Sequence, residues 1–499
     1  MTESKQKGLT RISRDRGMNV IILDDHKQMS TNLQYYRGAI DKFHKHTVKN
    51  VKGKAVEIER VSTQITKRVA EDFTSLLFNE DSRIFYDGDY DKKLQEALED
   101  NRFGHRFSHF LETTYGVLGN GYAAIYHKDG APKIDLINGN DVYITHHDNG
   151  ETYGVVVVNE KTAGKNDYTQ VTFHTYIGNK YRVEHAFYEN GQKTTNAEKD
   201  IGSPMSNTQK IAEVFDLDED SLNRISTTDD AGDIKFIWET ITDYKYFVHF
   251  KPNIKNNHDI NSPYGVGIIS NSRDLIRSLD KIYTDSVEEY DNGQSRIIVN
   301  TSMLEKKIIP REDGSTDSID IFDPDKKVYT AMPMGDEGKP IEIFSPILRE
   351  EQYERGISRI LSHIGFNAGF GTNYYRFENG SVATTATQVK MNKSDMWRNI
   401  RKHQNLLKEQ LFELVAGILD AMDLDFDPQK IMIEFDDSII IDDEKEYEKD
   451  MQLVDKGMMT KKEFLVKHKK ITEQEAEEKI KQAQEEDQQE QSSLFGIGD

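Results

Sequence analysis

The most informative feature of this 499-residue chain is the absence of cysteine. Without cysteine there are no disulfides, no thiolate zinc sites and no cysteine nucleophiles. Long hydrophobic runs are also missing. The most apolar short run, Val155 to Val158, has the length of a strand, whereas crossing a bilayer takes roughly 20 residues. The polar N-terminal sequence does not resemble a signal peptide. We therefore expect a soluble protein, made in a cytoplasm, without membrane partners.

Sequence motifs for catalysis are absent as well. No Gly-rich sequence ending in Gly-Lys-Ser/Thr occurs, which argues against an ATPase motor. His105 and His109 are four residues apart, but Arg106 stands where a zinc protease has glutamate. Two acidic runs resemble calcium loops but lack the required Gly and Glu: Asp87, Asp89 and Asp91, and Asp216, Asp218 and Asp220. A further acidic group is read as charge at a strand edge, or as an adventitious ion site: Asp436, Asp437, Asp442 and Asp443. We predict no catalytic residues, no metal, no cofactor and no enzymatic activity.

The composition favours an extended or oligomeric protein. Hydrophobic residues make up 36 % and charged residues 30 %, while aromatic residues reach 10 %, which disfavours full disorder. The formal charge is 65 − 87 = −22. A free-standing nucleic-acid binder carries a basic face, so general DNA binding is disfavoured.

The first half of the chain reads as helices followed by an antiparallel sheet. Helical spacing of apolar residues predicts helices over residues 61–78 and 92–100, continuing after a break to about residue 117. Turn pairs such as Asn149-Gly150 then separate strand-like runs. The predicted strands are residues 122–127, 133–137, 142–145, 153–159, 170–177 and 181–188. Residues 196–232 are polar and predicted to be irregular.

The second half predicts two helices around a small β insert. Ser262-Pro263 is a typical helix opening, and the first helix then ends near Gly293. Strands are predicted over residues 296–300 and 327–331, and Pro346 opens the second helix. A segment rich in glycine and aromatic residues precedes a helix of about 35 residues from Val389 to Met422. A strand over residues 430–441, short charged helices and a Glu/Gln-rich tail complete the chain.

This arrangement resembles the portal proteins of tailed bacteriophages, in particular those of long-tailed phages of Gram-positive hosts. The resemblance rests on Tyr374–Gly380 followed by Ser381–Val389, where Gln388 replaces the glutamate of the family's T-A-T-E-V sequence. It is supported, in chain order, by three shorter matches: Tyr35-Tyr36-Arg37-Gly38, Pro263-Tyr264-Gly265-Val266 and Phe435-Asp436-Asp437-Ser438.

The resemblance implies a multi-domain α+β fold that forms a ring. Its parts would be a wing (residues 1–261), a first stem helix (262–292), a clip (293–345), a second stem helix (346–366), a tunnel loop (367–380), a long helix with a wing strand (381–441), a helical crown (442–480) and a disordered acidic tail (481–499). It also implies a homo-oligomer, usually of twelve subunits and possibly thirteen when isolated, at one capsid vertex of the virion. Its expected partners are double-stranded DNA in the channel, the terminase, the head–tail adaptor, and the capsid and scaffold proteins.

The resemblance also indicates which residues would act. The tunnel-loop candidates for DNA contact are Asn373, Tyr374, Tyr375, Arg376 and Phe377. The candidates for an acidic channel lining are Asp285, Glu288, Glu289, Glu350, Glu351 and Glu354. The candidates for adaptor docking at the clip are Arg296, Asn300, Lys327 and Tyr329. An acidic bore would repel phosphates, so that DNA slides without sticking, and Arg273, Arg277 and Lys281 would pair with acids of a neighbour or touch phosphate.

The sequence also allows other interpretations of these residues and of the function. The stem acids are also explained as ordinary solvated helix surface, and the loop aromatics as packing between neighbouring loops. The alternative function is a phage nuclease or maturation protease fused to a structural body, and a third is an acidic scaffold that binds no DNA.

Overall fold

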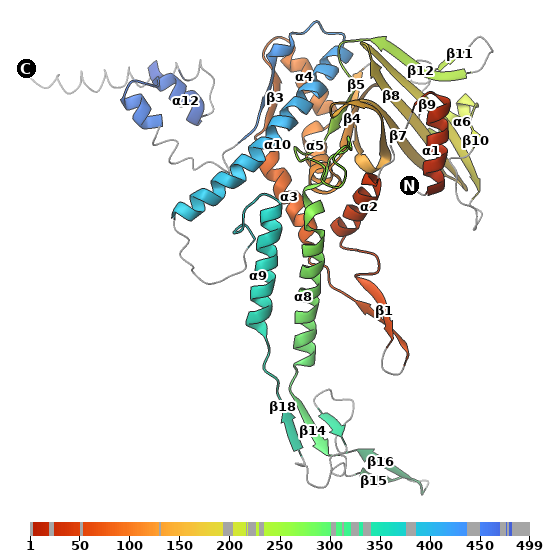
Figure 1. The fold of residues 1–499 in the computed structure, drawn as a ribbon, viewed down its shortest axis with the longest axis vertical. Helices are drawn as coiled ribbons and strands as arrows, with labels where there is room; N and C mark the ends of the chain where they lie inside the picture. The colour runs from red at the N-terminus through yellow and green to blue at the C-terminus, as the bar shows by residue number, and fades with distance from the viewer. Residues whose placement is uncertain are drawn as a thin grey trace, which may run out of the picture. The chain divides into compact units, whose positions relative to one another are not determined.

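The computed structural model describes residues 3–18, 24–49, 53–128, 131–192, 203–215, 217, 226–228, 234–300, 306–311, 314–320, 329–332, 341–375, 386–436, 450–469, 476 and 479–481. The chain divides into two compact units, Met1–Glu434 and Phe435–Asp499, which are described separately. The first contains mixed helix and sheet (Figure 1).

The largest element of the first unit is an antiparallel sheet with strand order β11-β12-β9-β8-β7-β6, in which β10 also pairs with β9. Its strands are β6 (Val142–Asp148), β7 (Glu151–Ala163), β8 (Asn166–Ile177), β9 (Lys180–Gln192), β10 (Ser203–Pro204), β11 (Ser226–Thr228) and β12 (Ile234–Ile241). Between β6 and β7, Asn149 and Gly150 both have positive φ (48° and 85°), which matches the twist of a tight hairpin. The antiparallel arrangement predicted for this region is confirmed.

The two faces of this sheet are covered by different helices. Side chains alternate along a strand, so Ala186 and Tyr188 of β9 face one way and Phe187 the other. The first pair packs with Leu9 and Ile12 of α1 (Glu3–Asp15). Phe187 instead packs with Ile211 of α6 (Thr208–Phe215). Both helices lie in segments where no helix was predicted, and residues 208–215 had been predicted to be irregular.

A second core forms around the long helix α10 (Ala386–Ala421). Its side chains Leu407, Leu411 and Leu414 are completely buried against a three-stranded sheet, β13-β4-β5, and neighbouring helices. The surrounding elements are α2 (Asp25–Tyr36), α3 (Ile65–Leu77), β3 (Arg83–Tyr86), α4 (Asp91–Asp100), α5 (Phe103–Leu111), a π-helix (Glu112–Leu118), β4 (Gly121–Lys128), β5 (Ala131–Asn138), β13 (Phe247–Phe250) and β19 (Ile431–Glu434). The predicted long helix is confirmed.

The first stem helix begins later than predicted. Residues 262–267 are not helical; a 3-10 turn starts at Ile268 and α8 spans Arg273–Asn292. The reason is that this segment is bonded into the core: the backbone NH of Ile144 donates to the buried Tyr264 hydroxyl (2.9 Å), and the NH of Gly265 donates to Asn120 (2.7 Å). A Cβ on Gly119, whose φ is +78°, would lie 2.4 Å from the Val266 backbone, so glycine is needed there.

Two segments project from this body. Helix α8 and the returning α9 (Glu350–Asn367) form an antiparallel pair, which we call the stem hairpin (Figure 1). Strands β1 (Lys45–Lys49) and β2 (Ala55–Glu59) form a separate two-stranded hairpin, which we call the arm. The prediction that the second stem helix starts at Pro346 is wrong by four residues.

The β insert between the stem helices contains its own small sheet. Strand β14 (Arg296–Asn300) pairs in parallel with β17 (Tyr329–Met332) and antiparallel with β18 (Ile341–Phe344). Strands β15 (Lys306–Pro310) and β16 (Thr316–Asp320) form a hairpin of their own. The strand predicted at residues 296–300 is confirmed. Because its own chain pairs both edges of β14, this strand has no free edge for pairing with another subunit.

The second unit, Phe435–Asp499, contains α12 (Lys461–Lys469). Thr460 and Glu463 form a reciprocal capping box at its start: the NH of Thr460 donates to the Glu463 carboxylate (2.8 Å), and the NH of Glu463 donates to the Thr460 hydroxyl (3.1 Å). His468 on this helix contacts Asp450 at 2.8 Å.

Candidate functional site

The stem hairpin is built on a narrow apolar seam with glycines at two contact points. A Cβ added to Gly356 would lie 2.6 Å from Ile282, and one added to Gly293 would lie 2.3 Å from Leu348. The missing side chains therefore let α9 and its entry segment approach α8 closely. Leu279 of α8 and Leu361 of α9 are buried near the body end, at 2 % and 3 % exposure.

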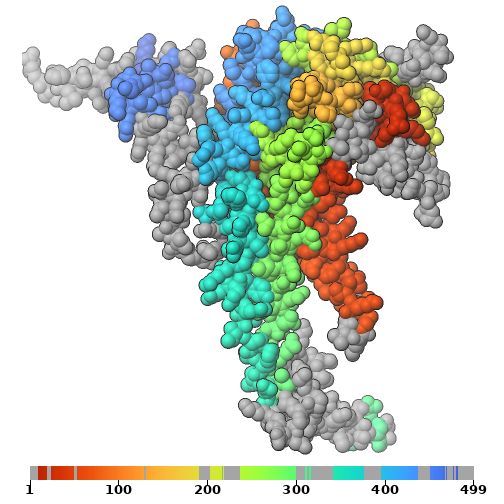
Figure 2. All heavy atoms as spheres, in the orientation of Figure 1, coloured from red at the N-terminus to blue at the C-terminus, as the bar shows by residue number. Residues whose placement is uncertain are grey.

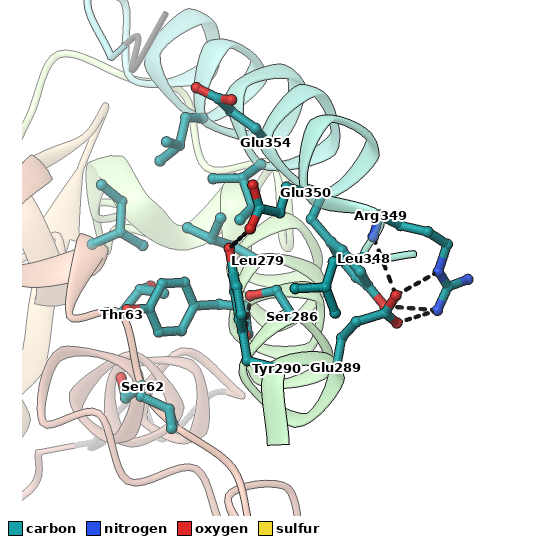
Figure 3. Close-up of a pocket in the computed structure, with 16 residues that line it drawn as sticks. Ser62, Thr63, Leu279, Ser286, Glu289, Tyr290, Leu348, Arg349, Glu350 and Glu354 are labelled. Carbon is teal, nitrogen blue, oxygen red and sulfur yellow. Dashed lines mark hydrogen bonds and ion pairs between the residues drawn. The ribbon is translucent and has the colours of Figure 1, made fainter. Parts of the chain in front are cut away.

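One of the six candidate lining acids, Glu289, pairs with Arg349, the residue just before α9. Its carboxylate accepts hydrogen bonds from the side-chain Nε (3.0 Å), the Nη2 and the backbone NH (3.3 Å) of Arg349 (Figure 3). These bonds lower the pKa of Glu289 to about 2 and raise that of the Arg349 guanidinium. Glu289 is therefore ionised but already neutralised by a partner in its own chain.

The other five acids are exposed and do not share one face. Asp285 and Glu288 lie three residues apart on α8. On α9, Glu350 accepts a hydrogen bond from the Tyr290 hydroxyl (2.9 Å), and Glu351 pairs with Arg355 at 3.3 Å. Glu354 lies beside Glu350, one helical turn further along. Asp285, Glu288, Glu350 and Glu354 are thus the candidates for which the described residues show no ion-pair partner.

The basic stripe of α8 is partly used inside the chain. The guanidinium groups of Arg277 and Arg60 both lie over the ring of Phe43, at 4.9 and 4.7 Å from its centre. Such cation–π contacts stabilise the junction of the arm and the stem. The Arg277 guanidinium is therefore already engaged within its own subunit and is a poor candidate for contact with phosphate.

A buried polar cluster, which the sequence reasoning missed, fixes the base of the arm to the stem. Asp280 of α8 is 1 % exposed, and its carboxylate contacts His44 Nε2 at 3.0 Å. It also accepts hydrogen bonds from the backbone NH (2.8 Å) and the hydroxyl (2.7 Å) of Thr63. The sequence contains one signal for this cluster: Asp280 lies four residues after Ile276, on the apolar side of the helix.

The start of the predicted tunnel loop is packed against the body. Tyr374 stacks on Phe370 at 4.6 Å between ring centres, and Tyr375 meets both rings edge-on. The Tyr375 hydroxyl donates a hydrogen bond to Asp72 of α3 (2.9 Å), and Asp72 also pairs with Arg68. Burial and the Asp72 charge raise the pKa of Tyr375.

Tyr375 is held within its own subunit, and its contact with DNA stays a prediction. Its hydroxyl is bonded inside its own subunit, whereas Tyr374 remains 40 % exposed and Asn373 is half-buried. Arg376 and Phe377 lie outside the described residues. Of the five loop candidates, Tyr374 is the aromatic side chain that the described residues present to solvent.

The clip candidates are only partly placed. Arg296 is exposed at the start of β14, and Asn300, at its end, lies opposite Met332. Tyr329 begins β17, opposite Ile297, while Lys327 is outside the described residues. Every residue of β18 is exposed, including Ile343 at 71 %.

A groove lies between the stem hairpin and residues 61–65, which we call the stem groove. Its volume is about 630 Å³, and Figure 3 shows residues of α8, α9 and the preceding loop converging on it. The lining is mainly apolar and includes Val61, Leu279, Tyr283, Tyr290 and Ile357. Glu350 and Glu354 add negative charge.

No group of three or more His, Asp or Glu side chains suited to a metal ion occurs in the described ranges. His105 and His109 do come together on α5, with ring centres 4.7 Å apart, but they remain a pair. Within the same ranges, no helix has the length and apolar character needed to cross a bilayer.

Comparison with known proteins decides the family. A family model described as "Phage portal protein, SPP1 Gp6-like" matches residues 21–493. The chain belongs to this family of phage portal proteins. The portal interpretation and the mixed α+β, multi-domain fold predicted from the sequence are thereby confirmed.

No curated protein matches this portal protein. Among solved structures, the chain is similar to one titled "Neck of empty GTA particle computed with C6 symmetry". The identity is 11 %, with 92 % of this chain and 97 % of the other covered and a TM-score of 0.42.

Proposed function

We propose that this portal protein closes into a ring, of twelve subunits in the virion, whose axial channel passes double-stranded DNA at one capsid vertex. In this proposal the terminase docks during packaging and the head–tail adaptor docks at the clip afterwards, and capsid and scaffold proteins surround the ring in the host cytoplasm during assembly. The single observation that supports it most is the family match over residues 21–493.

The charge of the chain suits a channel through which DNA moves without binding. Twelve copies carry 12 × (−22) = −264 formal charges. Asp285 and Glu288 are exposed carboxylates on α8 that the described contacts leave unneutralised. A bore lined by such groups repels the phosphate backbone, whereas a basic bore binds it through release of counterions.

The first experiment is the mass of the purified protein in solution, with averaged images of negatively stained particles. We expect rings of twelve or thirteen subunits with a central hole. A chain that stays monomeric at high concentration, and also with its scaffold and capsid proteins, would contradict the proposal.

A second experiment tests the channel lining. Replacing Asp285 and Glu288 together by lysine should leave rings intact but slow DNA passage, because positive groups hold phosphate. The matched control is Glu80→Lys with Asp81→Lys, the same charge change in an exposed turn of the body. Equal packaging by both double variants would contradict an acidic lining at Asp285 and Glu288.

We further propose that the chain is not an enzyme and that a separate terminase supplies the energy. In the described ranges, no observation favours the nuclease or protease alternative. An assay for metal-dependent DNA cleavage tests this point, and cleavage lost on chelation would contradict it.

A further inference from the structure

The arm has an apolar face that its own subunit leaves uncovered. Val48 and Val56 are directly opposite each other in the β1–β2 register, and His46 and Ile58 form the next pair on that face. The two valines are 37 % and 41 % exposed. A two-stranded hairpin alone is marginally stable in water, so such a face requires a partner surface.

The stem groove is the second uncovered apolar surface. Val61, Tyr283 and Tyr290 at its edge are 44 %, 42 % and 52 % exposed. Val287, 41 % exposed, lies between the two tyrosines at helical spacing and extends the apolar surface along α8.

The two surfaces differ in charge in a complementary way. Lys54 of the arm is exposed and lies two residues before Val56, on the side of the valine pair, whereas Lys49 lies on the other face with Thr47 and Ala55. The groove carries Glu350 and Glu354, while its Glu289 is neutralised by Arg349. A lysine beside the valine pair is therefore complementary in charge to the glutamates beside the apolar groove.

The far end of the arm points away from the stem hairpin of its own subunit. In the view of Figure 1 it diverges from α8 on the side opposite α9, and the space-filling view shows the same divergence (Figure 2). A closed ring joins two different surfaces of neighbouring subunits, so each subunit carries two complementary surfaces.

We propose that the arm of each subunit docks its Val48/Val56 face into the stem groove of the next subunit in the ring. This inference rests on the ring proposed above and names the contact that links neighbouring stems. The His44–Asp280–Thr63 cluster then acts as the anchor that holds the arm at its base while its far end reaches the neighbour.

The absence of cysteine makes the test direct, because every thiol is an introduced one. Val48→Cys with Ser286→Cys places one thiol on the apolar face of the arm and one in the groove. Ser286 lines the groove, and its side chain is similar in size to that of cysteine. Treating assembled rings with a short bis-maleimide should produce a ladder of covalent oligomers on a denaturing gel. The matched control is Thr47→Cys with Ser286→Cys, since Thr47 points to the other face of the arm, and it should give at least tenfold less product.

Two more measurements keep the proposal falsifiable. Mixing Val48→Cys subunits with Ser286→Cys subunits before assembly should give cross-linked pairs, because the contact lies between subunits. Val48→Asp with Val56→Asp should reduce the ring fraction at least tenfold at a fixed concentration, whereas Thr47→Asp with Ala55→Asp on the other face should not.

The outcomes separate this inference from the ring itself. Intact rings without a ladder, or a cross-link only within one subunit, would overturn arm docking and leave the ring standing. If the unmodified chain forms no ring at all, the proposed function fails and the docking inference fails with it.

Discussion

The body and the stem hairpin with its clip strands bury their apolar residues to very different degrees. In the body, Leu411 and Leu414 of α10 are completely buried. Beyond the stem groove, by contrast, Ile343 of the clip is 71 % exposed and Ile347, just before α9, is 93 % exposed. Contiguous exposed apolar surface marks sites of protein contact. The core of the body is therefore buried within one subunit, whereas the stem and clip expose apolar side chains that neighbours would cover in the proposed ring.

The largest expected effect is the loss of stability when a buried side chain of the body is truncated. Leu411→Ala removes a fully buried side chain and should lower the free energy of unfolding by about 2–5 kcal/mol. Ile347→Ser, at an exposed position, should change it by less than about 0.5 kcal/mol. Urea unfolding of the unassembled subunit measures both values, and equal losses would show that burial within one subunit does not separate the two regions.

The second prediction is that the stability of the body falls as the pH is lowered. Burial lowers the pKa of several imidazoles there: His26 and His185 to about 4, His174 and His403 to about 3, and His249 in the same direction. The unfolded chain takes up these protons near pH 6.5, so stability falls as the pH drops below that value. For His403, burial lowers the pKa far enough that about 2 kcal/mol is lost by pH 5, at roughly 1.4 kcal/mol per unit.

The measurement is the thermal midpoint of unfolding between pH 7.5 and 5, compared with a His403→Gln variant. Glutamine still accepts the backbone NH of Asn253, which now donates to His403 at 3.1 Å, but it does not titrate. The variant should lose less stability on acidification than the unmodified chain. Parallel pH profiles would show that His403 contributes nothing to acid sensitivity.

The third prediction concerns the point where the body holds the predicted tunnel loop. Tyr375→Phe removes the hydrogen bond to Asp72 and should cost about 1 kcal/mol, since the hydroxyl is only part-buried. Tyr374→Phe is the matched control, because no hydrogen bond of its hydroxyl is found among the described residues. Faster amide hydrogen exchange over residues 368–375 in Tyr375→Phe alone is expected. Equal exchange in both variants would mean that the Asp72 bond does not hold the loop.

The sequence predicted elements best where one periodic signal ran long enough. The apolar stripe of α10 gave the right element type and nearly the right bounds. The strand-like runs in β7 and β8 gave the right element type but strands that were too short, with residues 153–159 predicted for Glu151–Ala163 and residues 170–177 predicted for Asn166–Ile177. Short helices such as α1 and α6 were missed because two buried apolar residues in a polar segment make no visible period. Ser262-Pro263 predicted a helix start that is wrong, because hydrogen bonds of this segment to the body override its local capping signal.

The candidate site was predictable in residue type but not in partner. Exposed acids at Asp285 and Glu288 follow from helix position, whereas the Arg349 that neutralises Glu289 lies 60 residues away. The same holds for Tyr375 and Asp72, separated by 303 residues. Such pairs depend on how the chain returns on itself, which no local pattern contains.

The smallest expected effect lies in the stem itself. Glu289→Ala should leave the thermal midpoint of the whole chain nearly unchanged, because the Arg349 side chain is 63 % exposed and ion pairs open to water contribute little. It should still speed hydrogen exchange at Arg349 and the first turn of α9, where the Arg349 NH loses its acceptor. Glu351→Ala, which breaks the neighbouring pair with Arg355, is the matched control and should not affect Arg349.

The pH dependence of this pair sharpens the contrast with the body. The pKa of Glu289 is lowered from its ordinary 4.5 to about 2, so the pair is fully present above pH 4.5 and is lost only as the pH falls through about 2. Acidification from pH 7 to 5 should therefore weaken the body through its buried imidazoles while the Glu289–Arg349 junction stays intact. Hydrogen exchange at pH 5, corrected for intrinsic rates, should show opening in the body before opening at the start of α9. Opening in the reverse order would mean that acid destabilises the stem hairpin before it destabilises the body.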